Sequence, residues 1–298
     1  LQKDLKKYIK NHRNPLASIV IVEIKSGKIL ALVEGGQDKL IAPTTHAAFY
    51  QYFPAASLFK YVSTIALLEK IPFDFNQKIP INGRCSKVHR GGKWLSDHQL
   101  KYTRRMSLER AFANSCNSFY AKLVVEYVGL NLLNTYANHL GWMRPIPADF
   151  HIPISPIETP DMSGSSAYYV GQYGAGFGMV GMTPLHAAWL NLVIANNGYS
   201  QPLILKASSP IINKHSERLL REETAENMLK IMAGTVRHGT ASWVFRKRRY
   251  RRLRYKILGK TGTLSSKHLG GVTTWFTGLF PKEDPKIVVS AVVLNKRL

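Results

Sequence analysis

The hydrophobic pattern changes along the chain: β-type patterns occur toward both ends, and helical spacing dominates the middle. Residues 17–33 hold two apolar runs separated by a Lys-Ser-Gly-Lys turn at 25–28, which predicts a β-hairpin. Three further apolar runs, at 257–263, 272–280 and 287–294, predict strands joined by Gly and Pro turns. This order predicts an α/β fold with a central, mostly antiparallel five-stranded sheet flanked by helices.

Apolar residues at helical spacing and capping residues such as Ser107, Ser118 and Thr183 predict helices in the rest of the chain. The predicted helices are 3–13, 56–70, 108–113, 119–128, 131–140, 184–197 and 222–234. Residues 143–178 are rich in Pro, Ser and Gly and predict loops. We therefore expect one domain over residues 1–298. Its sheet subdomain would cover about 1–55 and 200–298, and an inserted all-helical subdomain would cover about 56–199.

The chain is strongly basic, with a formal net charge of +23, although its 45% hydrophobic content is ample for a globular core. Eight of the positive charges fall within Arg246–Lys256. Such an excess favours a polyanionic partner, so contact with an anionic membrane or wall polymer through this block is one interpretation. A solvated basic loop is the other. Tyr250 and Tyr255 interleave with the arginines, as stacking platforms do in proteins that bind nucleic acid, so a non-enzymatic binding module is a further alternative.

Several other classes of protein lack support in the sequence. The two cysteines, Cys85 and Cys116, form no disulfide framework and no zinc motif, and whether they pair is left open. Residues 176–181 spell G-x-G-x-x-G, but no strand pattern precedes them and no acidic residue follows at the required distance. No cofactor or metal is therefore expected. No apolar run reaches the roughly 18 residues that span a bilayer, and no signal peptide is visible.

Ser57-Leu58-Phe59-Lys60 is the first motif that could carry chemistry. A serine and a lysine three residues apart lie on one face of a helix, and the serine at the helix start has free backbone N–H groups beside it. A lysine kept neutral by burial can accept the serine proton. Taken alone, however, such a spacing also arises by chance.

Two further short motifs occur in the same chain. Ser115-Cys116-Asn117 stands between two predicted helices, where Ser and Asn are also ordinary capping residues. A hydroxyl there could relay a proton, and an amide could hold a substrate amide through its donor and its acceptor. Lys260-Thr261-Gly262-Thr263 falls on a predicted strand, and its glycine follows the lysine, which excludes a phosphate-binding loop.

The three motifs together, in the order S-x-x-K, S-x-N and K-T-G, resemble those of penicillin-binding protein transpeptidases. Much of the rest of the chain is similar to that family, including the opening hairpin, the glycine-rich stretch that leads to the T-P-L helix, and the TTWFTGLFP strand. The resemblance implies a β-lactamase/transpeptidase-like fold. The family usually has one more helix after the last strand, so a truncated or minimal form is expected here.

The resemblance also implies roles for residues at matching positions. Ser57 would be the nucleophile, Lys60 the general base and Ser115 the proton relay. Asn117 would bind the substrate amide, while Lys260, Thr261 and Thr263, with Gly262 in the same motif, would hold its terminal carboxylate. The backbone N–H groups of Ser57 and Thr263 would form the oxyanion hole.

The activity implied is acylation of Ser57 by peptidoglycan stem peptides ending in D-Ala-D-Ala, followed by transfer to an amine, with β-lactams acylating the same serine. It implies an extracytoplasmic location, in the periplasm or on the outer face of the inner membrane, through an N-terminal anchor outside this chain. A β-lactam sensor, a D,D-carboxypeptidase, a β-lactamase and a basic pseudo-enzyme remain alternatives. The intact motifs favour an enzyme, and no nucleic-acid partner is expected.

Overall fold

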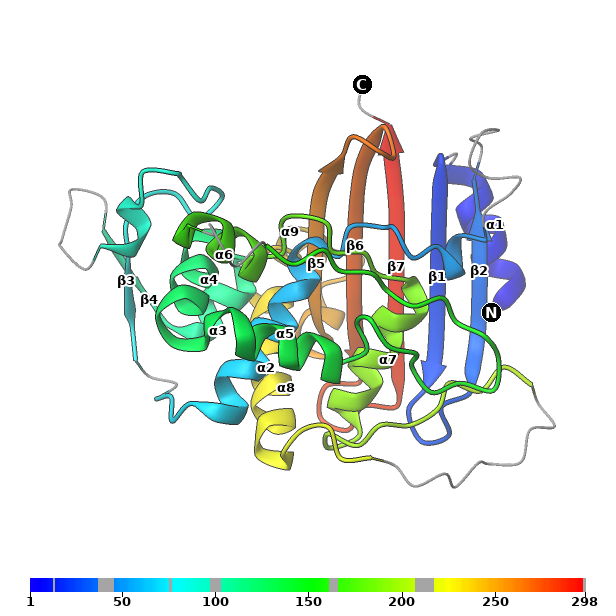
Figure 1. Cartoon of the computed structure of the whole chain (residues 1–298). Helices are drawn as coiled ribbons and strands as arrows, with labels where there is room; N and C mark the ends of the chain where they lie inside the picture. The colour runs from blue at the N-terminus through cyan, green and yellow to red at the C-terminus, as the bar shows by residue number, and fades with distance from the viewer. Residues whose placement is uncertain are drawn as a thin grey trace.

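An antiparallel sheet of five strands, in the order β2-β1-β7-β6-β5, organises the fold (Figure 1). The computed structural model describes residues 1–12, 14–36, 46–74, 77–96, 103–160, 166–206 and 217–296. The strands are β1 (Leu16–Glu23), β2 (Ile29–Gly35), β5 (Leu258–Ser266), β6 (Gly271–Phe280) and β7 (Ile287–Lys296). The predicted hairpin, the three C-terminal strands and the antiparallel five-stranded sheet are confirmed.

Helix α1 (Gln2–His12) covers one face of this sheet. Because side chains alternate between the two faces of a strand, the residues of β1 are buried in two different hydrophobic clusters. Ala17 packs with Ile9 of α1 and with Val33, whereas Val20 belongs to the main hydrophobic core. The main core lies on the opposite face, where α7 (Pro184–Ala195) packs against β1, β6 and β7.

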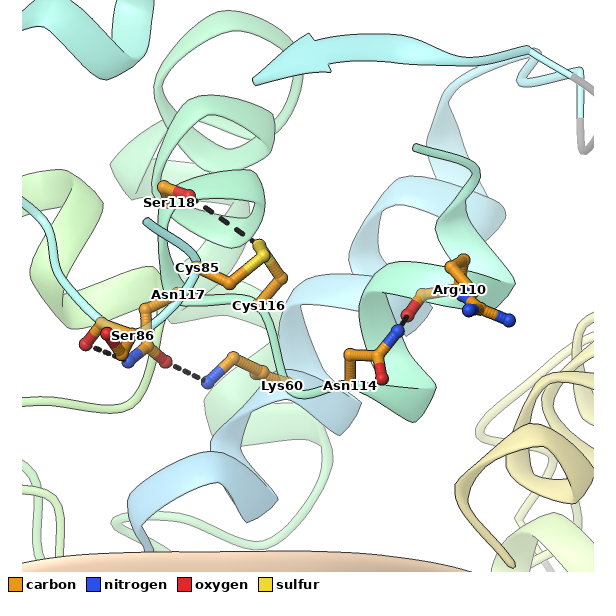
Figure 2. Close-up of a disulfide and its surroundings, with 8 residues drawn as sticks. All are labelled: Lys60, Cys85, Ser86, Arg110, Asn114, Cys116, Asn117 and Ser118. Atoms are coloured by element: carbon orange, nitrogen blue, oxygen red, sulfur yellow. Dashed lines mark hydrogen bonds between the residues drawn. A yellow bond between two sulfur atoms is a disulfide. The ribbon is translucent and has the colours of Figure 1, made fainter. Parts of the chain in front are cut away.

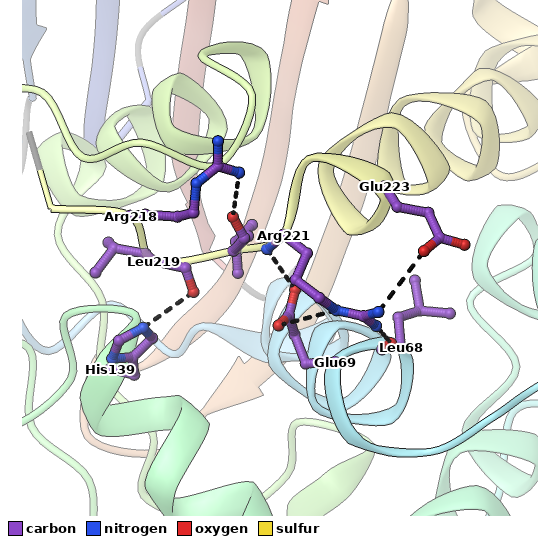
Figure 3. A network of polar contacts seen from close by, with 8 residues as sticks. Leu68, Glu69, His139, Arg218, Leu219, Arg221 and Glu223 are labelled. Carbon is purple, nitrogen blue, oxygen red and sulfur yellow. Dashed lines mark hydrogen bonds and ion pairs between the residues drawn. The ribbon is translucent and has the colours of Figure 1, made fainter.

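Helix α2 (Lys60–Lys70) and helix α8 (Glu222–Arg237) are fastened to each other at one end (Figure 3). The backbone N–H of Arg221 donates to Glu69 Oε1 at 2.8 Å, and its guanidinium contacts the same carboxylate at 3.5 Å. The guanidinium also donates to the carbonyl of Leu68 and pairs with Glu223. The helix that follows Ser57 is thereby fixed relative to α8, which packs on β5.

The inserted segment contains further helices: α3 (Leu108–Ala113), α4 (Asn117–Leu123), α5 (Gly129–His139) and α6 (Ala167–Gly174). A π-helical stretch, η4 (Val124–Val128), continues α4 toward α5. Ser107 caps α3 as predicted, since its side chain accepts from the backbone N–H of Arg110.

Three predictions for this segment are wrong in detail. Helix α4 begins at Asn117, with Cys116 at the capping position, because Cys116 is extended and the helical turn starts directly after it. Ser118 is therefore inside the helix. Helix α6 lies within the stretch predicted as loops. The segment is also not all helical, because β3 (Ile79–Ile81) pairs with β4 (Arg104–Met106) in a small antiparallel sheet.

Within the part of the chain that the structure describes, no helix is both long enough and apolar enough to cross a membrane.

Candidate active site

Ser57 lies in a 3-10 turn, η2 (Ala56–Phe59), immediately before α2. Ala56, directly before it, has φ +51°, a left-handed conformation that non-glycine residues adopt rarely and at a cost of about 1 kcal/mol or more. Hydrogen bonds hold the residues before it: Ala55 N–H donates to Val180 O at 2.8 Å, and Trp275 Nε1 donates to Pro54 O at 2.8 Å. The indole N–H therefore donates to the carbonyl of Pro54, three residues before Ser57. In a continued 3-10 turn this carbonyl would accept from the backbone N–H of Ser57.

Lys60 is fully buried, and its Nζ has three close partners. Ser57 Oγ and Asn117 Oδ1 are each 2.8 Å away, and the carbonyl oxygen of Ala175 is 2.7 Å away. Burial, assisted by the positive charge of Lys260, lowers the pKa of Lys60 well below its ordinary value.

The hydrogen-bonding capacity of a neutral lysine matches these partners. A neutral amine has two hydrogens and one lone pair. Asn117 Oδ1 and the Ala175 carbonyl can only accept, so together they take both hydrogens. The lone pair then faces the Ser57 hydroxyl, the one partner that can donate. The arrangement is that of a base hydrogen-bonded to a nucleophile.

Asn117 is held by the segment on its other side (Figure 2). Its Nδ2 donates to the carbonyl of Ser86 at 3.0 Å, and its backbone N–H donates to the carbonyl of Cys85 at 2.7 Å. Cys85 is joined to Cys116 by a disulfide, which settles the question that the sequence left open. Both polar ends of the Asn117 side chain therefore contact protein groups, and a substrate amide would have to share them.

Lys260 is fully buried, like Lys60, and its Nζ lies 3.0 Å from Ser115 Oγ and 2.8 Å from the Thr261 carbonyl. The ring of Phe112 lies beneath it, with 5.3 Å between Nζ and the ring centroid. Burial lowers the pKa of Lys260 to about 7. Ser115, like Ala56, has a positive φ, +54°. The structure therefore brings the second and third motifs into direct contact, although 145 residues separate them.

Strand β5 forms the other wall of the site and is an edge strand of the sheet. An edge strand leaves alternate backbone N–H and C=O groups without a sheet partner. Gly262 allows a close approach, because a β-carbon there would lie 3.3 Å from Trp275 and 3.4 Å from the Ala55 carbonyl. Thr263 is exposed on this strand, one residue further on.

The structure adds residues that the sequence analysis did not select. Thr240 contacts the hydroxyl of Thr261, and its own N–H donates to the Ala113 carbonyl at 3.0 Å. Thr240 lies in a short His-Gly-Thr loop after α8. The glycine in this loop was the only sequence feature that could have drawn attention to Thr240. The carbonyl of Ser86 had no signal of any kind, because backbone acceptors are not encoded by residue type.

No group of three or more potential ligands that could hold a metal ion occurs among the described residues. The chemistry that this arrangement can support is acyl transfer, because two lysines, two serines and an amide come together: Lys60 contacts Ser57 and Asn117, and Lys260 contacts Ser115.

Comparison with known proteins agrees with this geometry. Residues 17–297 match the family described as the penicillin binding protein transpeptidase domain. The chain belongs to this family. It is 24% identical over 326 aligned residues to the peptidoglycan D,D-transpeptidase PbpA of Mycobacterium tuberculosis H37Rv, covering 93% of this chain and 62% of that protein. The transpeptidase-family chain described here thus spans about three fifths of the length of these curated relatives.

Solved structures share the fold of this transpeptidase domain. The crystal structure of PBPA from M. tuberculosis superposes with a TM-score of 0.69 at 23% identity, covering 93% of this chain and 68% of that one. A peptidoglycan glycosyltransferase from Burkholderia ambifaria gives a TM-score of 0.75 at 18% identity, covering 99% and 87%. An imipenem acyl-enzyme complex of the M. tuberculosis protein gives 0.69 at 22%, covering 94% and 68%. The predicted β-lactamase/transpeptidase-like fold is confirmed.

Proposed function

We propose that this domain is a serine D,D-transpeptidase that forms a covalent acyl-enzyme at Ser57 with peptidoglycan stem peptides ending in D-Ala-D-Ala. β-Lactams would acylate the same oxygen. The observation that carries the proposal is the hydrogen bonding of Lys60, which presents a lone pair to the Ser57 hydroxyl. The names of the PbpA relatives and of their β-lactam acyl-enzyme structures support the same activity.

In the proposed first step, Lys60 accepts the proton of Ser57 while Oγ attacks the carbonyl carbon of the penultimate D-Ala. The backbone N–H groups of Ser57 and Thr263 stabilise the oxyanion. Its collapse breaks the peptide bond, and the terminal D-Ala leaves with a proton delivered through Ser115. Lys60 is neutral again once its proton has passed through Ser115 to the leaving D-Ala. An amine of a second stem peptide then attacks the ester carbonyl, and Lys60 carries the proton of that amine to Ser57 Oγ as the ester bond breaks, which frees Ser57 and forms the cross-link.

Lys260 has two roles in the proposed reaction. It orients Ser115 through the contact at 3.0 Å, and its positive charge favours binding of the terminal carboxylate of the substrate near Thr261 and Thr263. Asn117 positions Lys60 and shares its amide with the substrate. Because the substrate is cell-wall peptidoglycan, the reaction takes place outside the cytoplasm, in the periplasm or at the outer face of the inner membrane.

The deciding experiment is labelling with a fluorescent penicillin, followed by intact mass measurement. The chain should gain one acyl group and Ser57→Ala should gain none. Ser265→Ala, which changes an exposed serine on strand β5, should label like the parent. Equal labelling of Ser57→Ala would overturn the proposal.

A donor peptide ending in D-Ala-D-Ala, offered with a D-amino acid as acceptor, then identifies the reaction. Aminolysed product supports the transpeptidase. Product of hydrolysis alone would make the protein a carboxypeptidase, acylation without peptide turnover a sensor, and rapid multiple-turnover hydrolysis of a chromogenic cephalosporin a β-lactamase.

A further inference from the structure

A basic surface with two exposed aromatic side chains lies just before strand β5, outside the site described above. It comprises Trp243, Arg246, Lys247, Arg248, Arg249, Arg251, Arg252, Tyr255 and Lys256, all of them exposed. We call this set the basic surface. Its residues follow one another within a single segment of the chain, so its positive charge is local and dense.

No acidic residue neutralises this charge from nearby in the sequence. Between Glu226 and Glu283 the chain contains no Asp or Glu. In the described part of the chain, none of the basic side chains of the surface forms an ion pair with a carboxylate. The positive side chains of such a surface repel one another, and binding of an anion relieves this repulsion.

The aromatic residues add a second, apolar property. Trp243 is 65% exposed and Tyr255 is 54% exposed. The other four tryptophans of the chain are at most 2% exposed. Lys247 Nζ lies 5.2 Å from the centroid of the Trp243 ring, and the Arg254 guanidinium lies 5.5 Å from that of Tyr255. Each exposed ring is therefore paired with a cation.

The segment that carries the basic surface packs against the rest of the domain. Phe245, at the end of α9 (Ser242–Phe245), packs with Phe276 of β6, with 6.2 Å between ring centroids. Arg254, in the short turn η5 (Leu253–Tyr255), donates through Nε to the carbonyl of Arg237 at 2.8 Å. A docked surface loses little conformational entropy when it binds a partner.

We propose that the basic surface binds the headgroup region of a membrane that contains anionic phospholipids. Lipid phosphates would pair with the Arg and Lys side chains, and the rings of Trp243 and Tyr255 would enter the interface between headgroups and acyl chains. The two exposed rings favour a membrane over a soluble polyanion, since a hydrated polymer supplies charge but no apolar layer in which an indole is shielded from water. This binding is independent of acylation at Ser57.

The fluorescence of Trp243 provides the test, because this is the one exposed tryptophan of the five. The 298-residue chain is mixed with vesicles of equal parts phosphatidylglycerol and phosphatidylcholine, and with pure phosphatidylcholine vesicles. We expect co-sedimentation and a blue shift of emission with the anionic vesicles only. Binding should weaken strongly in 1 M salt, where the screening length falls to about 3 Å.

Two variants that each lose four positive charges distinguish binding by the basic surface from attraction by the net charge of the whole chain. Replacing Arg246, Arg248, Arg249 and Arg251 by Gln removes four exposed positive charges and should reduce vesicle binding by about a hundredfold or more. Replacing the exposed lysines Lys3, Lys6, Lys7 and Lys10 of α1 by Gln removes the same charge and should change binding by less than about threefold, because attraction falls off within a Debye length. Both variants should still react with labelled penicillin, which shows that they fold.

Three results would overturn the proposal. The first is no binding of the intact chain to anionic vesicles. The second is an equal loss of binding in the α1 variant, which would assign the effect to net charge. The third is an unchanged emission spectrum on vesicles together with equally tight binding to soluble polyphosphate, which would make the surface a site for a polymer.

Discussion

Asn117 joins the first two motifs physically: its Oδ1 lies 2.8 Å from Lys60 Nζ, while its backbone N–H donates to the Cys85 carbonyl at 2.7 Å. The amine that faces Ser57 is therefore oriented by an amide whose own position depends on a loop fastened by a disulfide. This connection leads to the first two predictions.

Lys60→Arg should reduce the rate of acylation by labelled penicillin about a thousandfold or more. A guanidinium stays protonated and cannot accept the Ser57 proton, although it can still donate to Asn117 and Ala175. Stopped-flow or gel-based acylation rates measure the effect, with Lys70→Arg, at the far end of the same helix, as the matched control. Acylation by Lys60→Arg at the parental rate would remove Lys60 from its proposed role.

Loss of the Cys85–Cys116 disulfide should lower both stability and acylation rate. The bridge closes a loop with a sequence separation of 31, for which about 3 to 4 kcal/mol of unfolding free energy is expected. Reduction should also slow acylation, because Asn117 then depends on weaker restraints. Thermal unfolding and acylation are compared before and after reduction by a phosphine, confirmed by mass measurement. A double Cys85→Ala/Cys116→Ala variant should not respond to the phosphine, and an unchanged rate in the fully reduced parent would contradict the prediction.

Gly176→Ala should impair acylation about a hundredfold, since a shift of the reacting oxygen by about 1 Å costs that much. Gly176 has φ +89°, and a β-carbon there would lie 2.0 Å from the carbonyl oxygen of Ala56, next to Ser57. Gly178→Ala is the control. Its φ is +90°, so the backbone strain is the same, but apart from its own chain neighbours no atom would lie within 4 Å of its β-carbon. Similar acylation rates for the two variants would assign the effect to strain and not to the displacement of Ala56.

Lys260 should make stability depend on pH in the neutral to alkaline range. Its pKa is about 7 in the folded chain and near 10.5 when unfolded, so between these values the unfolded state binds more protons and stability rises with pH. Relative to Lys260→Met, the parent should gain about 2 kcal/mol between pH 7 and pH 9. Denaturant unfolding of both proteins at these two pH values measures the difference. A constant difference would mean that Lys260 is not titrating as proposed.

The sequence predicted those features that depend on residue type and local order. Ser57 and Lys60 are one helical turn apart, so their contact follows from spacing alone. The hairpin β1–β2 and the strands β5, β6 and β7 have strong apolar patterns and clear turns. Lys260 could be selected only because its motif occurs together with the other two.

The features that were missed depend on long-range packing. The contact of Thr240 with Thr261 and the acceptor role of the Ser86 carbonyl leave no periodic pattern in the sequence. Strands β3 and β4, of three residues each, are too short to show alternation. Helix α4 begins before Ser118, although serine is a preferred capping residue. Cys116, which is bonded to Cys85, takes the capping position instead, so the helix starts at Asn117.

The strand order has a consequence for how the domain is made. The first strand, β1, pairs with the last, β7, from Leu16↔Leu294 to Glu23↔Ile287. A chain made from its N-terminus must therefore keep one edge of the β1–β2 hairpin unpaired until β7 has been added. Contacts between such distant residues form slowly. We therefore expect Ser57 to react with a penicillin only after β7 has been synthesised, because without this central strand the β5–β6 pair that carries Lys260 is not joined to β1.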